Sequence, residues 1–346
     1  MNSIASDTMV NGSEQGGEWQ QQLAQSRWEL GDLLRYLRLP KAFIERQLAA
    51  NLGSVDFPLR VTQSFADRIE KGNTADPLLR QILPSARELE FAPGFSDDPL
   101  QEKESNPCPG LIHKYRSRVL LTVTNSCAVH CRYCFRQHFP YDENNPGKNQ
   151  WREAFDYIAQ KPELNEVILS GGDPLAANDQ YLQWLINSLS GIDHIQRLRI
   201  HTRLPVVLPA RVNESLITVL AQWPRQKVIV LHCNHPNEID AQVANAATML
   251  RSAGVTLLNQ SVLLAGINDD AATLAQLSER LFAIDVMPYY LHILDRVKGA
   301  AHFEVNRAEA LAIHEQLKLR LAGFLVPRLV EELPGMGSKR DVVDIS

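Results

Sequence analysis

Between positions 119 and 134 the chain reads VLLTVTNSCAVHCRYC, a short β-rich run followed at once by three closely spaced cysteines. Val119–Thr124 carries the β-branched residues that favour a strand. Cys127, Cys131 and Cys134 then follow, with three and two residues between them. Thiolates at this spacing can converge from one loop on a soft metal centre, either zinc or an iron–sulfur cluster. The sequence therefore predicts a strand that ends at a metal-binding loop.

Beyond this segment, short β-rich runs alternate with helical patterns, which is typical of βα units around a parallel sheet. The expected strands are Val119–Thr124, Val167–Ser170, Leu198–Thr202, Val228–Cys233, Thr256–Asn259, Val286–His292 and Phe324–Val330. The expected helices are Trp151–Gln160, Asp179–Leu189, Asn213–Gln222, Ala241–Ala253, Ala271–Ala283 and Val305–Leu319. Six or seven such units predict an α/β fold, a full or partial (β/α) barrel. Its chemistry should collect at the carboxyl ends of the strands and in the loops that follow them.

The N-terminal third has a different texture. Apolar residues recur at helical spacing from Glu18 to Ala50, so we expect two or three helices broken near Pro40. Seven prolines punctuate residues 51–109, which predicts short helices followed by an irregular segment. We therefore divide the chain into a disordered tail (1–17), a helical wrapping region (18–108), the barrel (109–330) and a C-terminal loop and tail (331–346).

The composition describes an ordinary globular protein. The 346 residues carry 35 Lys and Arg against 40 Asp and Glu, a formal net charge of −5, with 45% hydrophobic and 22% charged residues. This balance argues against capture of nucleic acid or of an anionic membrane. No run approaches the roughly 18 apolar residues that span a bilayer, and Met1–Gly17 lacks the apolar stretch of a signal peptide. Five cysteines, three of them clustered, argue against a disulfide framework, so we expect a cytoplasmic protein.

Three interpretations of the cysteine loop are open on spacing alone. Three ligands on a four-iron cube leave one iron free to bind a chelating substrate or cosubstrate, whereas a closed structural cluster requires four cysteines. A structural zinc site with His130 or His138 as the fourth ligand is the second interpretation. Core cysteines without a metal are the third. Cys108 and Cys233 have no partner at metal spacing, and we expect them to be structural or shielded thiols.

The arrangement of Cys127, Cys131 and Cys134 at the end of a first barrel strand resembles the signature of the radical S-adenosylmethionine superfamily. The resemblance implies a partial (β/α)6 TIM-like barrel with an N-terminal helical extension. It also implies a 4Fe–4S cluster on these cysteines, with S-adenosylmethionine chelated to the fourth iron. The next expected strand ends in Ser-Gly-Gly-Asp-Pro, residues 170–174, where paired glycines allow close backbone approach. This stretch resembles the glycine-rich motif that the superfamily uses against the methionine moiety. The implied cofactor contacts are Gly171, Gly172 and Asp173.

The last glycine-rich loop reads LPGMGSK over residues 333–339 and points to a second cofactor. A lysine can form a Schiff base with pyridoxal phosphate and must swing away when substrate replaces it, so a glycine-rich hinge suits Lys339. Taken alone, a lysine in such a loop is more commonly a surface residue without a role. Together with the cysteine loop, it resembles the lysine 2,3-aminomutases, in which the pyridoxal lysine follows a Pro-Gly-rich loop near the end of the barrel. The resemblance covers Pro109 to Lys339.

The aminomutase resemblance implies roles for further residues. Arg136 matches the arginine that binds the substrate carboxylate, for which a bidentate fork is suited. Asp295 matches one of two acidic residues that receive the distal ammonium of lysine. The other family position is an aspartate, and Glu332 stands there in this chain, which adds a methylene and keeps the charge. Further matches are Tyr115 and Arg118 around pyridoxal phosphate, and His232, Asn234 and Gln260 on the S-adenosylmethionine side, where each is otherwise an ordinary polar residue at a strand end.

The implied reaction is a radical 1,2-amino shift that converts L-lysine to (R)-β-lysine. A 5′-deoxyadenosyl radical starts it and pyridoxal phosphate assists it, because the β-hydrogen of lysine is not acidic enough for closed-shell chemistry. The chain ends seven residues past Lys339, without the zinc-binding C-terminal extension of longer family members, and so resembles a short bacterial branch. That branch implies links to elongation factor P, to the ligase that attaches β-lysine to it, and to an unidentified electron donor.

Rival functions stay open at this point. Another aminomutase substrate, arginine or glutamate, is one rival, although two acidic residues argue against a second carboxylate. A radical S-adenosylmethionine enzyme without pyridoxal phosphate is another. From a different class, a zinc-bearing binding module for nucleic acid or protein explains the cysteines and leaves both glycine-rich loops unexplained.

Overall fold

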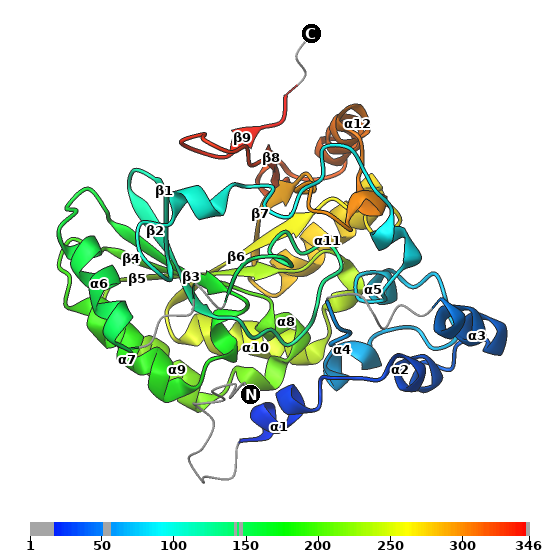
Figure 1. Cartoon of the computed structure of the whole chain (residues 1–346), viewed down its shortest axis with the longest axis horizontal. Helices are drawn as coiled ribbons and strands as arrows, with labels where there is room; N and C mark the ends of the chain where they lie inside the picture. Colours follow the sequence, from blue (N-terminus) through cyan, green and yellow to red (C-terminus); the bar gives the residue numbers. More distant parts are fainter. Residues whose placement is uncertain (1–16, 51–56, 142–143, 145–147, 344–346) are drawn as a thin grey trace, which may run out of the picture.

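The computed structural model describes residues 17–50, 57–141, 144 and 148–343. Within these ranges the central element is a nine-stranded sheet (Figure 1). In chain order and in sheet order alike, its strands are β1 (Leu111–Tyr115), β2 (Arg118–Thr124), β3 (Glu166–Gly171), β4 (Arg197–Thr202), β5 (Gln226–His232), β6 (Val255–Val262), β7 (Met287–His292), β8 (Arg328–Glu331) and β9 (Arg340–Asp341). β2 through β8 run parallel, whereas β1 and β9 pair antiparallel with the two outermost parallel strands. The expected partial barrel is confirmed.

Helices form the crossovers, as parallel strands require. The main crossover helices are α6 (Lys148–Ala159), α7 (Asp179–Ser190), α9 (Glu214–Ala221), α10 (Ala241–Ser252), α11 (Ala271–Ala283) and α12 (Arg307–Lys318), with the short α8 (Leu204–Val207) following β4. In Figure 1, α6, α7 and α9 lie along the outer side of the sheet. Asn or Asp side chains cap the first turns of α7, α9, α10, α11 and α12 by accepting a backbone N–H. Each such cap contributes about 1 kcal/mol.

The expected strands and helices agree with the structure to within a few residues, with one correction. Phe324 lies in a 3₁₀ turn, η8 (Gly323–Leu325), and β8 begins only at Arg328. The expected strand Phe324–Val330 is therefore wrong in its first half, because Phe324 is 59% exposed and packs on Phe282 of α11 rather than in the sheet. The short antiparallel strands β1 and β9 carry no periodic pattern that predicts them.

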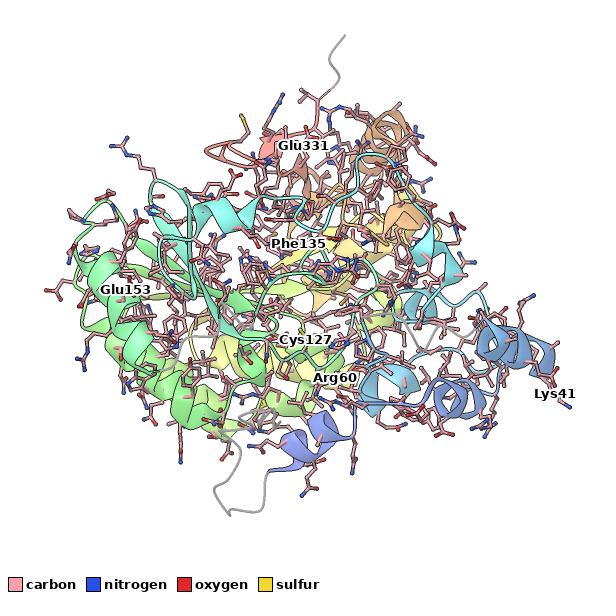
Figure 2. All side chains as sticks on the ribbon, in the orientation of Figure 1. Lys41, Arg60, Cys127, Phe135, Glu153 and Glu331 are labelled. Carbon is pink, nitrogen blue, oxygen red and sulfur yellow. The ribbon has the colours of Figure 1, made fainter. Side chains whose placement is uncertain are left out.

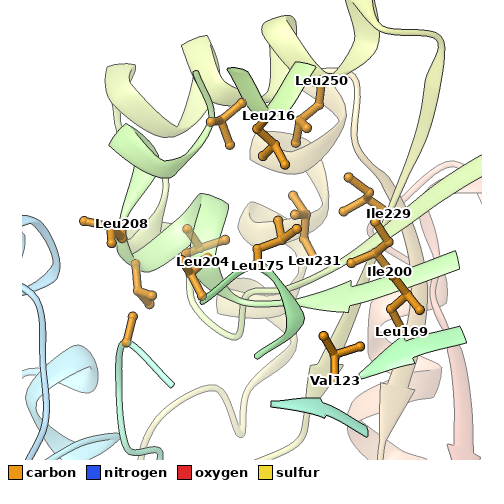
Figure 3. Close-up of a cluster of buried hydrophobic side chains, with 14 of the residues drawn as sticks. Val123, Leu169, Leu175, Ile200, Leu204, Leu208, Leu216, Ile229, Leu231 and Leu250 are labelled. Atoms are coloured by element: carbon orange, nitrogen blue, oxygen red, sulfur yellow. The ribbon is translucent and has the colours of Figure 1, made fainter. Parts of the chain in front are cut away.

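The core lies between the sheet and its layer of helices. In Figure 3, Leu216 of α9 and Leu250 of α10 lie next to the helices at the top of the view, and Ile200 and Ile229, which belong to β4 and β5, lie next to the strands at the right. Burial of each such side chain contributes roughly 1.5–3 kcal/mol. Because side chains alternate along a strand, the neighbours of these core residues point to the other face of the sheet. That face is the interior of the barrel.

The N-terminal region packs on the same core. Its helices are α1 (Glu18–Ala24), α2 (Leu30–Tyr36), α3 (Lys41–Ala49), α4 (Gln63–Asp67) and α5 (Pro77–Arg80), and Pro40 precedes α3, which confirms the expected break. Leu33 and Phe65 are fully buried in the barrel's core cluster. The turns η2 (Ala86–Leu89) and η3 (Glu102–Ser105) then lead to β1. Most of the expected disordered tail, residues 1–16, lies outside the described residues. Among the helices of the described residues, none combines the length and the apolar run that a membrane span requires.

Candidate active site

A cavity of about 440 Å³ occupies the interior of the barrel. The loop after β2, which carries the three clustered cysteines, lines it together with the carboxyl ends of β3 to β7 and the segment that follows β8. In Figure 2, Cys127 and Phe135, both lining residues, lie near the middle of the molecule, whereas Lys41 and Glu153 lie at its periphery. The functional side chains therefore collect where the active sites of barrel enzymes lie.

The three clustered cysteines open on this cavity. Cys127, Cys131 and Cys134 all line it, and all five cysteines of the chain are free. Burial raises the pKa of Cys134 to about 12 and raises that of Cys127 as well, and a bound metal centre would favour the thiolate forms of both. Among the described residues, no three Cys, His, Asp or Glu side chains converge closely enough to hold a single metal ion. Three free thiols that line one cavity suit a cluster of several irons with one iron left open to another ligand.

The histidines considered as zinc ligands contact other parts of the chain. His130 Nδ1 lies 2.7 Å from the carbonyl oxygen of Pro58, and its ring stacks on Phe57. His138 Nε2 lies 3.4 Å from the carbonyl oxygen of Lys298. Neither histidine is among the residues that line the cavity. Cys108 and Cys233 are buried away from it, as expected of structural thiols.

The glycine pair at the end of β3 packs against the loop that leads to the cysteines. Gly171 has a φ of +121°, and a Cβ there would lie 2.6 Å from the carbonyl oxygen of Thr124. A Cβ on Gly172 would lie 2.5 Å from the carbonyl oxygen of Ser126. Both distances are too short for any side chain, so only glycine permits this contact. The pair therefore fixes the cysteine loop, and both glycines also line the cavity.

Five charged side chains form an alternating row along the cavity wall. Arg136 donates from Nε and Nη2 to Glu102 at 2.7 and 2.9 Å. Lys114 Nζ lies 3.3 Å from Glu102 and 3.2 Å from Glu332, and Lys339 donates to Glu332. Burial alone would raise the pKa of Glu332, but Lys339 and Lys114 outweigh it and hold this pKa well below its usual range. Glu332 is therefore ionised between two cations.

Asp295, in the loop after β7, faces the same cavity. Burial raises the pKa of its carboxyl to about 7; Lys339 lowers this pKa and Glu332 raises it further. The carboxyl therefore changes charge near neutral pH. A cation that enters the cavity favours the ionised form, since an opposite charge nearby lowers a carboxyl pKa.

Another part of the cavity wall carries basic and aromatic groups. Tyr115 and Arg118 flank the turn between β1 and β2, and the guanidinium of Arg118 lies 4.0 Å from the centroid of the Tyr115 ring. Arg199 and His201 reach the interior from β4, and His292 from β7. Arg199 Nε and the Nε2 atoms of both histidines are buried without a hydrogen-bond partner in the described structure. Buried polar atoms normally have partners, so these three indicate the place of a polar ligand.

The residues expected on the S-adenosylmethionine side separate into two groups. His232 and Gln260 line the cavity. Asn234 lies behind its wall, fully buried, where its Nδ2 donates to the Tyr133 hydroxyl at 2.6 Å and its Oδ1 accepts from the backbone N–H of Val262. Its amide thus joins segments of the fold. Asp173 lines the cavity, but its carboxylate accepts from Thr202 Oγ1 at 2.7 Å and from the N–H groups of Arg203, Leu204 and Leu175.

Three charged residues that line the cavity were not predicted from the sequence. Arg199 occupies an inward position of an expected strand, and strand alternation could have indicated it. Arg203 follows the end of β4 and donates from Nη1 to Cys131 Sγ at 2.7 Å, so its place at a strand end was the available signal. Glu102 lies in the irregular segment before β1, where no pattern predicts its partner.

Comparisons with known proteins bear on this site. The model of the Radical SAM superfamily matches residues 121–277. An L-lysine 2,3-aminomutase from Escherichia coli (strain K12) is 52% identical over 322 residues, which cover 93% of each chain. The chain belongs to the lysine 2,3-aminomutase family. A member from Haemophilus influenzae is 52% identical and covers 89% of this chain and 90% of its own. A solved radical SAM methyltransferase from Sphaerobacter thermophilus is 17% identical, covers 64% of this chain and 68% of its own, and has a TM-score of 0.45.

Membership in the lysine 2,3-aminomutase family implies a 4Fe–4S cluster, S-adenosylmethionine and pyridoxal phosphate. The residues present fit these groups. Three free thiols face one cavity, which suits the cluster. Lys339 and the unpartnered nitrogens of Arg199, His201 and His292 line the same space, which suits an anionic, polar cofactor beside an amine.

Proposed function

We propose that this chain converts L-lysine to (R)-β-lysine by moving the α-amino group to the neighbouring carbon. The observation that supports it most directly is the composition of one cavity. In that cavity Arg136 can bind a carboxylate, and Asp295 and Glu332 can bind a distal ammonium. Lys339 and three free thiols line the same cavity. Relatives that are 52% identical over most of their length carry the same activity in their names.

In this proposal each cofactor has its own residues. Cys127, Cys131 and Cys134 hold the cluster, and Lys339 holds pyridoxal phosphate. When bound, the cluster with S-adenosylmethionine supplies a radical that abstracts hydrogen, and pyridoxal phosphate supplies the π-system that assists the amino shift. The groups assigned to the two organic cofactors are Tyr115, Arg118 and Arg199 for the phosphate, and Gly171, Gly172, His232 and Gln260 for S-adenosylmethionine.

The protein's own contribution is to fix both ends of the substrate and to exclude water. Arg136 binds the α-carboxylate through charge-assisted hydrogen bonds, which are stronger than neutral ones. Asp295 and Glu332 receive the distal ammonium. Because both acidic groups lie in a largely buried cavity, a substrate with a second carboxylate would bring like charges together there. The site therefore favours lysine over glutamate.

A direct comparison of substrates tests this proposal. Reconstituted, reduced protein with S-adenosylmethionine and pyridoxal phosphate is incubated separately with lysine, arginine and glutamate, and products are separated by chiral chromatography. We expect β-lysine as the main product and turnover of the other two near background. Faster formation of β-arginine or β-glutamate would show that arginine or glutamate, and not lysine, is the preferred substrate.

The same proposal includes the destination of the product. β-Lysine would serve a ligase that attaches it to elongation factor P, and an unidentified reductant would supply the electron. The five free cysteines suit a reducing compartment, which supports a cytoplasmic location. Incubation of the enzymatic product with ATP, purified elongation factor P and its ligase should add the mass of one lysyl group to the factor, with ATP cleavage driving formation of the amide bond. If the mass of elongation factor P does not increase, this part of the proposal is wrong, whereas the proposed aminomutase activity is unaffected.

A further inference from the structure

Glu102 contacts Arg136 from a distant part of the sequence. It begins η3 in the wrapping region, 34 residues before Arg136, and both side chains are buried. Its two carboxylate oxygens accept from Nε and Nη2 of the guanidinium at 2.7 and 2.9 Å. Ser170, at the end of β3, accepts from Nη1 at 2.9 Å. The guanidinium is therefore held at each of its three nitrogens.

This arrangement leaves part of the guanidinium free. A guanidinium has five N–H groups, and the three bonds use one on each nitrogen. One N–H on each terminal nitrogen remains for a ligand. The rings of Phe135 and Phe139 lie 4.9 and 5.8 Å from the guanidinium carbon, so the group has little freedom to turn.

The charges around Glu102 keep its carboxylate in place. Lys114 Nζ lies 3.3 Å from it and adds a second cation. Burial alone would raise the pKa of Glu102, but Arg136 and then Lys114 outweigh it and lower this pKa. An ionised carboxylate held by two cations is costly to displace. Glu102 is therefore not expected to occupy the carboxylate site of Arg136 and leave it when substrate binds.

We propose that Glu102 is a positioning residue that holds the guanidinium of Arg136 with its terminal nitrogens free for the α-carboxylate of the substrate. The inference rests on the proposed function, in which Arg136 binds that carboxylate. It adds a substrate class: amino acids with a free α-carboxylate are accepted, and amines or carboxyl-blocked lysine are not. Glu102, which belongs to the wrapping region, thus acts on substrate selection through Arg136.

The test compares Glu102→Gln with the unmodified holoenzyme in lysine kinetics and in inhibition by 1,5-diaminopentane, which is lysine without its carboxylate. We expect KM for lysine to rise about 10- to 100-fold, because the variant loses a charge-assisted hydrogen-bonded pair. The change in kcat should be smaller. The inhibition constant of 1,5-diaminopentane should stay unchanged, because this ligand makes no contact with Arg136. Iron content and the affinity for S-adenosylmethionine should also stay unchanged.

Asp179→Asn is the matched control. It removes the carboxylate that pairs at 2.6 Å with Arg211, a fully buried arginine outside the cavity. If loss of any buried arginine pair raised KM for lysine, Asp179→Asn would raise it too. We expect instead that KM for lysine is unchanged in Asp179→Asn, because Arg211 does not line the cavity. If Glu102→Gln does not fold, Ser170→Ala removes the partner of Nη1 and should raise KM for lysine several-fold.

The outcomes separate the two proposals. Unchanged or lower KM for lysine in Glu102→Gln would overturn the positioning role, and a lower KM would show that Glu102 competes with substrate. An equal loss of affinity for 1,5-diaminopentane would also overturn it. If Arg136→Gln itself leaves KM for lysine unchanged, the proposed carboxylate site fails and the inference fails with it.

Discussion

Lys339 donates a hydrogen bond to Glu332, seven residues earlier, across the turn that joins β8 to β9. Lys114 Nζ lies 3.2 Å from the same carboxylate, so Glu332 forms ion pairs with two lysines. If Lys339 holds pyridoxal phosphate as proposed, Glu332 would lose one of these two cations and would become available to the ammonium of a substrate. The same carboxylate would then connect the cofactor lysine with substrate recognition.

Substitution of Lys339 by alanine should abolish lysine turnover and leave iron and sulfide content unchanged. The amine that the proposed function assigns to pyridoxal phosphate is lost, whereas the hydrogen bond that Lys339 donates goes to Glu332 and not to the cysteine loop. The measurement is turnover together with metal analysis and the pyridoxal absorbance of the purified protein. Lys318→Ala, which removes an exposed lysine paired with Glu315, should behave as the unmodified protein. Full activity of Lys339→Ala with pyridoxal phosphate bound as before would defeat the assignment.

Substitution of Glu332 by glutamine should lower kcat/KM for lysine about 10- to 100-fold, because two cations and the substrate ammonium lose a charged partner. Glu332→Asp, which restores the family aspartate, should lose less. The neighbouring Glu331 pairs at 3.0 Å with Arg307 and does not line the cavity, so Glu331→Gln is the control. Equal losses in the Glu331 and Glu332 variants would point to local unfolding instead of substrate recognition.

The pH dependence of kcat/KM for lysine should report Asp295. Its pKa is raised to about 7, chiefly by burial, so below that pH the carboxyl is neutral and pairs weakly with an ammonium. We expect kcat/KM, which reflects the free enzyme, to rise with pH and to level off above about pH 7. Asp295→Asn should lower the plateau and remove this step, and Asp295→Lys should abolish turnover. An identical step in the asparagine variant would assign the titration to another group.

Substitution of Gly172 by alanine should loosen the cysteine loop. The added Cβ would lie 2.5 Å from the carbonyl oxygen of Ser126 and 2.9 Å from that of Asn125, so the backbone must move at a cost of about 1–3 kcal/mol. We expect a lower unfolding temperature and less iron per chain after reconstitution. Gly323→Ala is the control, since a Cβ there has no neighbour within 4 Å. Normal iron content in Gly172→Ala would show that the loop tolerates the shift.

The parallel strands and their helices could be predicted from the sequence because apolar periodicity reflects burial directly. The cysteine triplet and Lys339 could also be singled out, since few residue types carry that chemistry. Glu102 could not, because its partner Arg136 lies 34 residues away and no local pattern encodes such a contact. Asn234 shows the converse limit: a polar residue near a strand end can satisfy the fold behind the cavity wall, and only the structure separates the two cases.

In the proposed function, one cavity holds a 4Fe–4S cluster and pyridoxal phosphate for a radical reaction on lysine. The most direct measurement is an ultraviolet–visible spectrum of protein purified without oxygen, before and after dithionite. Iron, sulfide, zinc and pyridoxal phosphate are quantified on the same sample. We predict a brown band that dithionite bleaches, about four irons per chain, a pyridoxal absorbance, and β-lysine when lysine and S-adenosylmethionine are added. A colourless, zinc-loaded protein without pyridoxal phosphate would contradict the account.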